Sequence, residues 1–454
     1  MFGLDFSEIA GCLEPKKVVN SAGPHSRFRG VALDTRGLKK GEAFLALKGR
    51  SFDGHDFLLD AQRKGASFLV VEKIPAVLKQ KIKIPVLVIE DSLKALGLLS
   101  KRLVEKYSPK VCAVTGSLGK TTVKEMIGHV LRGRVPLIIS KGSENNQIGL
   151  PKTLLSLNKT GYFCVVELGT NHFGEISYLA DICCPEIGVI TCVDNAHLKS
   201  FKTKRGVLRE KVSLFKACPL ALPVLNFDDK LLRNVKIKVK PVYFGENISS
   251  GIYFNFLKRE KDSVVFKINS KYLLRLKTLA SFNVYNACAC MAVCRYWGIP
   301  LKYSSEALSD FHFPKMRFQM KRIKGAVFIN DAYNSNPRAL KKALESLKLI
   351  PAKRKIAVLA DMLELGERAL SLHCKVSQNV YEAGFFKVIL LGKFMHKMGR
   401  ELILKGVDKN KVVFAKDVKD AARHLAVIIG KGDLAFLKGS RKFALERVIP
   451  QSSL

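Results

Sequence analysis

Residues 111–122 constrain the fold more than any other part of this sequence. An apolar run at 111–114 precedes a turn bounded by Gly116 and Gly119, and Lys120 and Thr121 follow at once. Apolar residues then recur at 123, 126, 127, 130 and 131, which is the spacing of an amphipathic helix. A strand, a glycine turn and a helix N-terminus in this order form a cradle whose backbone N–H groups point at a bound phosphate.

This phosphate-binding loop predicts a nucleoside triphosphate as ligand. Lys120 is suited to neutralise the phosphates, and the hydroxyl of Thr121 is suited to hold Mg²⁺. Val114 stands where the longer G-x-x-x-x-G-K-[ST] pattern has its first glycine, so the chain carries only the shorter form. The alternative is a glycine turn that does no more than start a helix, and the strand and helix on either side favour the nucleotide site.

The chain of 454 residues is long enough for two to four domains. Apolar strand-like runs alternate with helical segments, a pattern that predicts parallel sheets with crossover helices. We predict a small α/β domain at 1–106, a central, doubly wound and mostly parallel P-loop domain at 107–312, and a further α/β domain at 313–454. Beyond the run at 111–114, we expect strands at 43–47, 67–71, 86–89, 163–168, 187–193, 224–227, 264–268, 326–330, 355–359, 388–391, 412–415 and 434–437.

The formal net charge of +38, from 77 basic and 39 acidic residues, would attract anions. The basic residues are spread along the chain without interleaved aromatic residues, so a solvated lysine-rich surface is favoured over a nucleic-acid interface. The eleven cysteines include no C-x-x-C pair, and we expect reduced thiols and no zinc at Cys288, Cys290 and Cys294. Residues 1–15 lack a signal-peptide pattern and no uncharged apolar run approaches the roughly 18 residues of a membrane helix, so we expect a cytoplasmic protein without membrane insertion.

Polar residues gather where predicted strands end, which is where ligands bind in doubly wound sheets. Glu167 lies near the end of the run at 163–168, and a carboxylate there is a good ligand for Mg²⁺. Side chains from 170–172 and 194–197 would reach the same sheet edge, those from 145–146 would lie beside the P-loop, and those from 331–336 would follow a strand end of the last domain. Helix caps, turns and an ordinary loop histidine at 172 are the alternatives when each segment is taken alone.

Several segments, in this order along the chain, resemble the Mur ligases, the ATP-dependent enzymes of peptidoglycan precursor synthesis. The matching segments are 115–122, 145–151, 167–176, 195–198 and 331–337, with 34–36, 46–49 and 52–57 near the start and 361–367 and 437–441 near the end. The segment at 331–337, Asp-Ala-Tyr-Asn-Ser-Asn-Pro, points within the family to the addition of D-alanyl-D-alanine. The resemblance covers nearly the whole chain.

The resemblance implies that domain 1–106 binds a UDP-linked substrate, that domain 107–312 is the ATPase, and that domain 313–454 is a Rossmann-like ligase domain. It implies that ATP phosphorylates the terminal carboxylate of UDP-N-acetylmuramoyl-tripeptide, and that the amine of D-alanyl-D-alanine then attacks the acyl phosphate. The expected cofactors are ATP and Mg²⁺, and the expected partners are these two substrates and no nucleic acid. We expect a monomer, and its positive charge suits such anionic reactants.

The resemblance also implies a nucleotide site. Contacts to the ATP phosphates are implied for Gly116, Ser117, Leu118, Gly119, Lys120, Thr121 and Thr122. An adenine contact is implied for Asn286, and phosphate and ribose contacts are implied for Arg317 and Asp331, with Tyr333, Asn334 and Asn336 beside them. The family often has His-Asn where this chain has Phe282-Asn283, so one contact on the adenine side differs.

Catalytic roles are implied for Lys120, Glu167, His197 and Lys211. Thr121, Glu167 and His197 resemble the Mg²⁺ ligands of the family, and Lys211 resembles a lysine that family members carbamylate. A carbamate turns this cation into an anion that can organise a second Mg²⁺, whereas an exposed lysine without a special role is the alternative. Substrate contacts are implied for Thr35, Arg36, Asn145, Asn146, Thr170, Asn171, His172, Lys438, Ser440 and Arg441.

Three other functions remain open from the sequence. A sibling amide ligase, such as a folylpolyglutamate synthetase, would share the core, but the segments at 34–36 and 331–337 argue against it. A P-loop ATPase stimulated by nucleic acid would use the high charge and would bind with a steep salt dependence. A UDP-sugar-binding protein without catalysis would tolerate the loss of Lys120. The sequence does not specify the third residue of the tripeptide.

Overall fold

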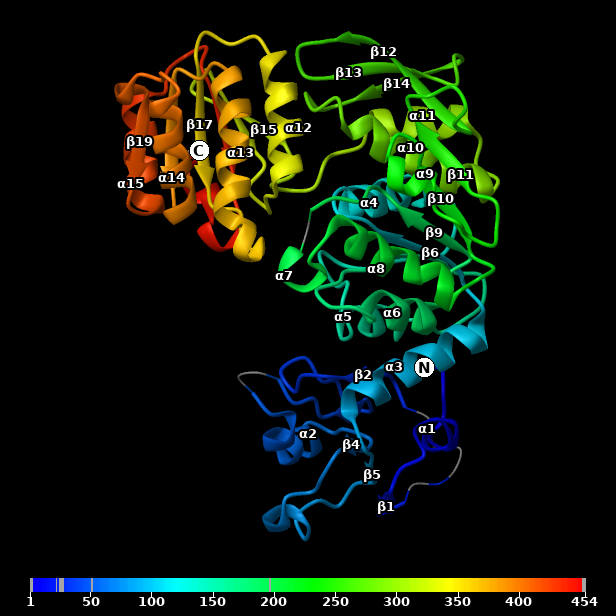
Figure 1. Cartoon of the computed structure of the whole chain (residues 1–454). Helices are drawn as coiled ribbons and strands as arrows, with labels where there is room; N and C mark the ends of the chain where they lie inside the picture. Colours follow the sequence, from blue (N-terminus) through cyan, green and yellow to red (C-terminus); the bar gives the residue numbers. More distant parts are fainter. Residues whose placement is uncertain (1–2, 22, 24–27, 50–51, 196, 451–454) are drawn as a thin grey trace.

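The computed structural model has three α/β lobes that follow one another along the chain, and the central lobe is the longest (Figure 1). It describes residues 3–21, 23, 28–49, 52–195 and 197–450. Within these residues the strands form sheets of five, nine and six strands. The N-terminal lobe lies at one end of the central lobe, and the C-terminal lobe lies beside the central lobe's other end (Figure 1).

The N-terminal sheet has the strand order β1-β5-β4-β3-β2, and β1 is its antiparallel member. Its strands are β1 Lys17–Val19, β2 Val31–Ala32, β3 Ala43–Leu45, β4 Leu69–Val71 and β5 Val86–Val88. The helices of this lobe are α1 Phe6–Leu13 and α2 Leu58–Arg63, with α3 Ser92–Tyr107 leading into the central lobe. Short 3-10 helices lie at Gly54–Phe57 and Ala76–Leu78.

The central sheet has the order β14-β13-β12-β11-β10-β9-β6-β8-β7. The pairs from β7 to β12 are parallel, whereas β12, β13 and β14 pair antiparallel as an extension at one edge. The strands are β6 Lys110–Thr115, β7 Leu137–Ile139, β8 Phe163–Glu167, β9 Ile187–Ile190, β10 Leu222–Asn226, β11 Val242–Gly245, β12 Ile252–Arg259, β13 Val264–Ile268 and β14 Tyr272–Leu276. The helices are α4 Lys120–Leu131, α5 Gly149–Leu154, α6 Glu175–Cys183, α7 Leu198–Phe201, α8 Lys204–Ala217, α9 Lys230–Arg233, α10 Asn283–Tyr296 and α11 Leu301–Ser309.

Helices cover both faces of this sheet, which explains why its parallel strands are continuous apolar runs. Apolar residues of α4 and α10 pack with Cys112 and Val114 on one face, and residues of α6 and α8 pack with Val111 and Ala113 on the other. The alternation of these four β6 residues between two cores is the two-residue period of a strand.

The C-terminal sheet has the order β15-β16-β20-β17-β18-β19, and β15 is antiparallel to β16. Its strands are β15 Gln319–Ile323, β16 Ala326–Asn330, β17 Lys355–Ala360, β18 Lys387–Leu391, β19 Val412–Ala415 and β20 Leu434–Lys438. Its helices are α12 Pro337–Lys348, α13 Ala369–Glu382, α14 Lys393–Leu404 and α15 Val418–Ile428. Short 3-10 helices lie at Gly366–Arg368, Lys409–Lys411, Arg441–Phe443 and Leu445–Val448.

Helix α3 joins the first two lobes through one continuous apolar core. Leu96, Leu99 and Leu103 are fully buried, in a cluster that contains Phe6 of α1 and Leu154 of α5. Full burial of each leucine is worth roughly 2 kcal/mol, so this helix fixes the N-terminal lobe on the central one.

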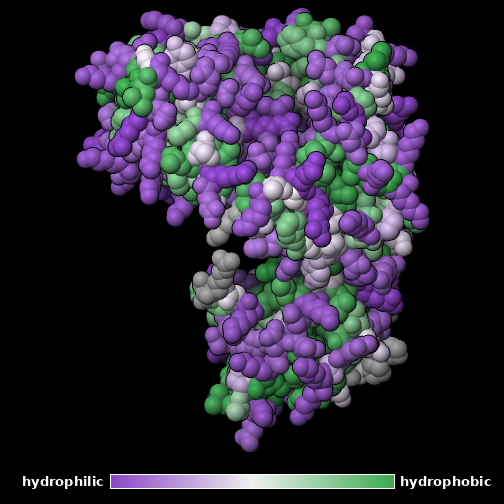
Figure 2. Space-filling model, viewed as in Figure 1, coloured by the Kyte–Doolittle hydropathy of each residue, from purple (hydrophilic) through white to green (hydrophobic). Residues whose placement is uncertain are grey.

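The predicted three-part, mostly parallel α/β fold is confirmed, and each strand that we expected coincides with a strand. The divisions at 106/107 and 312/313 stay predictions, and each falls between two of the sheets. Hydrophilic residues cover most of the face of the molecule in Figure 2. A search of the described residues found no helix with the length and apolar composition to cross a membrane.

Candidate functional site

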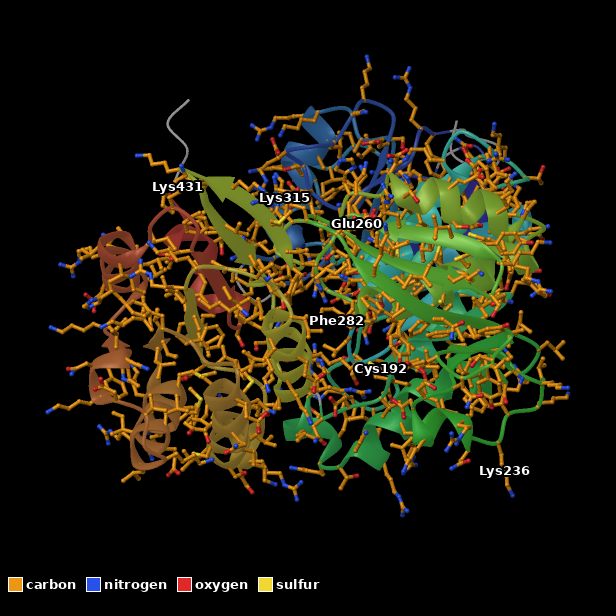
Figure 3. All side chains as sticks on the ribbon, turned by 90° about the horizontal axis from the view of Figure 1, so that it is seen from above. Cys192, Lys236, Glu260, Phe282, Lys315 and Lys431 are labelled. Atoms are coloured by element: carbon orange, nitrogen blue, oxygen red, sulfur yellow. The ribbon has the colours of Figure 1, made fainter. Side chains whose placement is uncertain are left out.

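A cavity of about 370 Å³ lies where the central and C-terminal lobes meet. The central lobe lines it with the loops after β6, β8 and β9, that is, at the carboxyl ends of parallel strands. The C-terminal lobe adds residues from the ends of β16, β17 and β20 and from α12. Figure 3 labels two of the lining residues, Cys192 and Phe282, at this junction of the lobes.

The loop from β6 to α4 needs glycine at two positions. Gly116 and Gly119 have φ angles of 145° and 82°, in the region that side chains other than glycine rarely adopt. A Cβ atom at Gly116 would overlap the hydroxyl of Thr191, and one at Gly119 would overlap the amide oxygen of Asn286. The two glycines therefore let the Thr191 and Asn286 side chains pack directly against the turn, which a side chain at either position would prevent.

Lys120 and Thr121 stand at the start of α4, inside this cradle. The Lys120 ammonium donates a hydrogen bond to the Gly116 carbonyl at 3.0 Å, and burial lowers its pKa from the usual value. The Thr121 hydroxyl donates to one carboxylate oxygen of Glu167 at 2.8 Å, and the Asn145 amide donates to the other at 2.8 Å. A hydroxyl and a carboxylate in contact are oxygen ligands of the kind that Mg²⁺ prefers.

A buried lysine on α4 holds the loop that carries Asn145. Lys124 is fully buried and donates to the carbonyls of Ser140 and Gly142 at 2.5 and 3.1 Å. It also lies 2.9 Å from a carboxylate oxygen of Glu125. These contacts fix the segment after β7, and so place the Asn145 amide against Glu167.

Glu210 of α8 fixes the loop between β8 and α6, which carries the predicted contacts Thr170 and Asn171. Its carboxylate accepts hydrogen bonds from the backbone N–H groups of Gly174 and Ile176, both at 2.8 Å, and from the Thr170 hydroxyl at 3.2 Å. No sequence pattern singles out Glu210, because its partners lie 34 to 40 residues away.

Lys211 follows Glu210 on α8 and is not among the residues that line the cavity. It is 3% exposed, so the alternative of an exposed lysine is wrong. Burial, and then the neighbouring charge of Lys120, lower the pKa of Lys211 to about 7. Much of this side chain is therefore an uncharged amine near neutral pH.

The C-terminal lobe brings a second group of charges over the P-loop. The guanidinium of Arg317 stacks on the Tyr333 ring at 3.8 Å and approaches the Thr121 hydroxyl at 3.4 Å. Asp331 accepts a hydrogen bond from the backbone N–H of Phe318 at 3.1 Å and forms an ion pair with buried Lys438. The cavity is thus lined by cations from both lobes.

Two polar residues of the segment after β16 also shape the start of α12. The Asn334 carbonyl accepts from Lys438 at 3.2 Å, and the Asn336 side chain caps α12 by accepting from the Ala339 N–H at 2.9 Å. The Asn336 side chain therefore caps a helix and lines the cavity as well.

His197 has a partner that we did not predict. It lies just before α7 with a φ angle of 51°, and its Nδ1 lies 3.0 Å from a carboxylate oxygen of Glu364 in the C-terminal lobe. Hydrogen bonding to His197 lowers the pKa of Glu364. The segment at 361–367 was part of the family resemblance, so the motif was visible although the role of this glutamate was not.

Most of the predicted site residues do come together. The cavity is lined by Ser117, Leu118, Gly119, Lys120, Thr121, Thr122, Asn145, Asn146, Glu167, Thr170, Asn171, His197, Asn286, Arg317, Asp331, Tyr333, Asn334, Asn336 and Lys438. Gly116 contributes through its carbonyl to Lys120. Their roles toward a ligand stay predictions.

Five predicted substrate contacts lie outside this lining. Thr35 and Arg36 belong to the N-terminal lobe, where Arg36 is exposed and its hydrogen bonds hold the pKa of Asp34 at about 2. His172 contributes a backbone N–H to Glu175 at 3.2 Å. The Ser440 hydroxyl accepts from the Leu363 N–H at 2.8 Å, and Arg441 pairs with Glu446 at 2.7 Å.

Residues that we did not predict line the cavity mainly from α10, α12 and the loop after β17. They include Phe282, Tyr285, Arg338, Lys342, Leu363 and Glu364. Arg338 and Lys342 are four residues apart after the proline that opens α12, so they share one helix face. That spacing was readable in the sequence, but which lobe the face would meet was not.

Comparison with known proteins shows that three successive parts of the chain match domains of one protein family. The Mur ligase middle domain matches residues 114–294, the Mur ligase glutamate ligase domain matches 316–441, and the Mur ligase family catalytic domain matches 27–103. The UDP-N-acetylmuramoyl-tripeptide–D-alanyl-D-alanine ligase of Haemophilus influenzae is 32% identical over 393 residues, which cover 84% of this chain and 83% of that protein.

Solved structures of similar proteins match a still larger share of this chain. MurF from Acinetobacter baumannii matches with a TM-score of 0.89 and 27% identity, covering 99% of this chain and 98% of that one. MurF ligase from Thermotoga maritima, solved in complex with ADP, matches with a TM-score of 0.83 and 27% identity, covering 93% and 96%. With three family domains in the same order and a matching fold throughout, the chain belongs to the Mur ligase family.

Proposed function

We propose that this protein is an ATP-dependent ligase that joins D-alanyl-D-alanine to UDP-N-acetylmuramoyl-tripeptide, giving the pentapeptide precursor of peptidoglycan in the cytoplasm. The observation that carries the proposal is the cavity in which Lys120 and Thr121 of the P-loop face Arg317 and Lys438 of the C-terminal lobe. The names of the relatives and the ADP complex of the Thermotoga maritima protein support it. That the enzyme acts as a monomer stays a prediction.

The residues present fit ATP and Mg²⁺. The glycine turn and the start of α4 line the cavity that would take the phosphates, and Thr121 and Glu167 would hold the metal, with His197 as a further ligand. Bound there, Mg²⁺ would spread the charge of the phosphates and polarise them for transfer. Asn286 and Asp331 would contact the adenosine part from the two lobes.

The first chemical step brings two anions together. The terminal carboxylate of the tripeptide attacks the γ-phosphorus of ATP, an acyl phosphate forms, and ADP leaves. Lys120 and Arg317 line the cavity where this negative charge concentrates, and fixed cations in a site that excludes water stabilise it strongly. The contact between Arg317 and Thr121 joins the two lobes at the cavity, and this arrangement is suited to keeping water away from the acyl phosphate.

The second step forms the amide. The free amine of D-alanyl-D-alanine attacks the acyl carbon, and the tetrahedral intermediate expels phosphate. Amide and hydroxyl groups of Asn145, Asn146, Thr170 and Asn171 line the cavity and can orient the peptide. Thr35 and Arg36, in the N-terminal lobe, would bind the distant UDP end of this long substrate.

Lys211 would act as a carbamate. An amine must be uncharged to attack CO₂, and a pKa of about 7 supplies that form near neutral pH. The product is an anion beside Lys120, which turns a repulsive neighbour into an attractive one. We propose that this carbamate helps to organise a second Mg²⁺.

The test is phosphate release from ATP with UDP-N-acetylmuramoyl-tripeptide, with and without D-alanyl-D-alanine, together with the mass of the product. Release should need both substrates and should vanish in Lys120→Ala. Lys236→Ala is the matched control, because this exposed lysine lies at the far end of the central lobe (Figure 3). Release without either substrate, or release that rises with DNA or RNA, would refute the assignment.

A further inference from the structure

Arg338 of α12 reaches from the C-terminal lobe across to the central lobe. Its Nη1 donates a hydrogen bond to the carbonyl of Val193 at 3.2 Å. Its Nε lies 3.8 Å from a carboxylate oxygen of Asp194, and its Nη1 lies 3.8 Å from one of Asp229. One guanidinium thus meets three acceptors that all belong to the central lobe, a use to which its several donors are suited.

Contacts within the central lobe hold the acidic acceptors of Arg338 in place. The Asp229 side chain is 3% exposed, and one of its oxygens accepts from the Val193 N–H at 2.8 Å. Its other oxygen caps α9 by accepting from the Leu231 N–H at 3.1 Å. Two carboxylates and a carbonyl in a largely buried place favour a cation, and Arg338 is the cation that the opposite lobe supplies.

The same short segment is bonded to the P-loop on its other side. The Ser117 hydroxyl accepts from the Asp194 N–H at 2.9 Å and lies 3.3 Å from the Asp194 carbonyl, to which it donates. The Ser117 N–H donates to the Cys192 carbonyl at 2.9 Å. Residues 192–194 therefore link the P-loop on one side to Arg338, and so to the C-terminal lobe, on the other.

We propose that Arg338 is a positioning residue for the ligation. It fixes the C-terminal lobe against the P-loop through residues 192–194, so that Arg317 and Lys438 stay over the ATP phosphates. The inference rests on the proposed function for its kinetic consequence, but the contact between the lobes can be tested without it. The ion pair of His197 with Glu364 joins the lobes elsewhere, so loss of Arg338 loosens the arrangement without separating the lobes.

The kinetic test compares Arg338→Ala with Lys341→Ala. Lys341 is an exposed cation on the same helix that lines the same groove as Asp194 and Asp229, and no ion pair of Lys341 occurs among the described residues. We expect Arg338→Ala to lower kcat about fivefold with little change in the KM for ATP, because the lost contacts order the lobes and leave the P-loop intact. Arg338→Lys should recover part of kcat, since it keeps the charge. A raised KM for ATP with kcat unchanged would overturn the inference in favour of direct nucleotide binding.

The second readout needs no catalysis. Hydrogen exchange of the ligand-free protein should be faster at the Val193 and Asp194 amides in Arg338→Ala, and unchanged in Lys341→Ala, because Arg338 holds this segment from outside. Equal exchange in both variants and the wild type would overturn the inference. If the wild type proved not to ligate at all, the proposed function would fail, whereas the exchange result would still decide whether Arg338 couples the lobes.

Discussion

Replacing Glu210 by glutamine should cost much more stability than a change of one atom suggests. The Glu210 residue is 2% exposed, and its two oxygens accept from the N–H groups of Gly174 and Ile176 at 2.8 Å. These donors belong to the first turn of α6, whose N–H groups have no partner within the helix. The buried carboxylate therefore satisfies two unpaired donors and also interacts favourably with the helix dipole.

The magnitude follows from what glutamine cannot do. In either orientation, its NH₂ group faces one of the two N–H donors, so one hydrogen bond to a charged acceptor is lost. The donor left without a partner is buried when it belongs to Ile176 and can reach water when it belongs to exposed Gly174. A hydrogen bond to a charged group is worth about 1.5–3 kcal/mol, and we expect a loss of about 3 kcal/mol. For a domain of the size of the central lobe, this corresponds to a fall in Tm of about 6–12 °C.

Calorimetry near neutral pH, with hydrogen exchange at the Gly174 and Ile176 amides, measures this loss. Exchange is needed because a chain with three lobes does not unfold in one step. Asp181→Asn is the matched control on α6, the helix whose first turn Glu210 binds: the Asp181 side chain is 58% exposed and pairs with Lys101 at 2.8 Å, so we expect a loss of less than about 1 kcal/mol. If the two variants lowered Tm equally, the reasoning about the buried carboxylate would be wrong.

Three further predictions concern the site. Folding lowers the pKa of Lys211 from 10.5 to about 7, so the unfolded chain binds this proton more tightly than the folded protein does. Without CO₂, Lys211→Met should therefore be more stable than the wild type, and the difference in unfolding free energy should be largest below pH 7. Urea titrations should show this difference shrinking as the pH rises towards 10.5. Asp331→Asn and Lys438→Met should each cost about 3 kcal/mol of unfolding free energy by leaving a buried charge unpaired, and in a double-mutant cycle the double variant should cost less than their sum. Gly119→Ala should weaken ADP binding in calorimetry by more than tenfold, whereas Gly298→Ala, at the same φ of 82° but with open space around its Cβ, should bind ADP like the wild type.

The predictable part of the fold is the part buried on both faces. Parallel strands covered by helices read as short apolar runs, and the run at 111–114 is a direct example. The strands that we did not predict are short, lie at sheet edges or carry exposed residues. Strand β12 has four consecutive exposed residues, and β15, at the edge of its sheet, includes Lys321 and Arg322. Charged residues protect such edges and remove the apolar signal at the same time.

The same reasoning separates the site residues that could be predicted from those that could not. Residues at or after the ends of strands, such as Glu167 and His197 in the central lobe and Asp331 in the C-terminal lobe, could be predicted because parallel strands bring their carboxyl ends to one edge of each sheet. Residues on helices could not, because their place depends on how the lobes pack. Glu210 acts on a loop 34 to 40 residues away, and Arg338 contacts a segment 145 residues away. A local sequence pattern cannot reveal contacts between residues that lie so far apart along the chain.

Among the basic residues behind the net charge of +38, those inside the cavity affect the chemistry much more than those on the surface. Exposed lysines are screened beyond about 8 Å at physiological ionic strength. Buried cations are not, and burial together with the neighbouring charge of Arg317 lowers the pKa of Lys120. Burial also lowers the pKa of Arg317, and the charge of Lys120 contributes to the lowered pKa of Lys211. Lys120 and Arg317 repel each other in the ligand-free protein, and a polyphosphate relieves that repulsion on binding, so part of its affinity comes from repulsion already present in the fold.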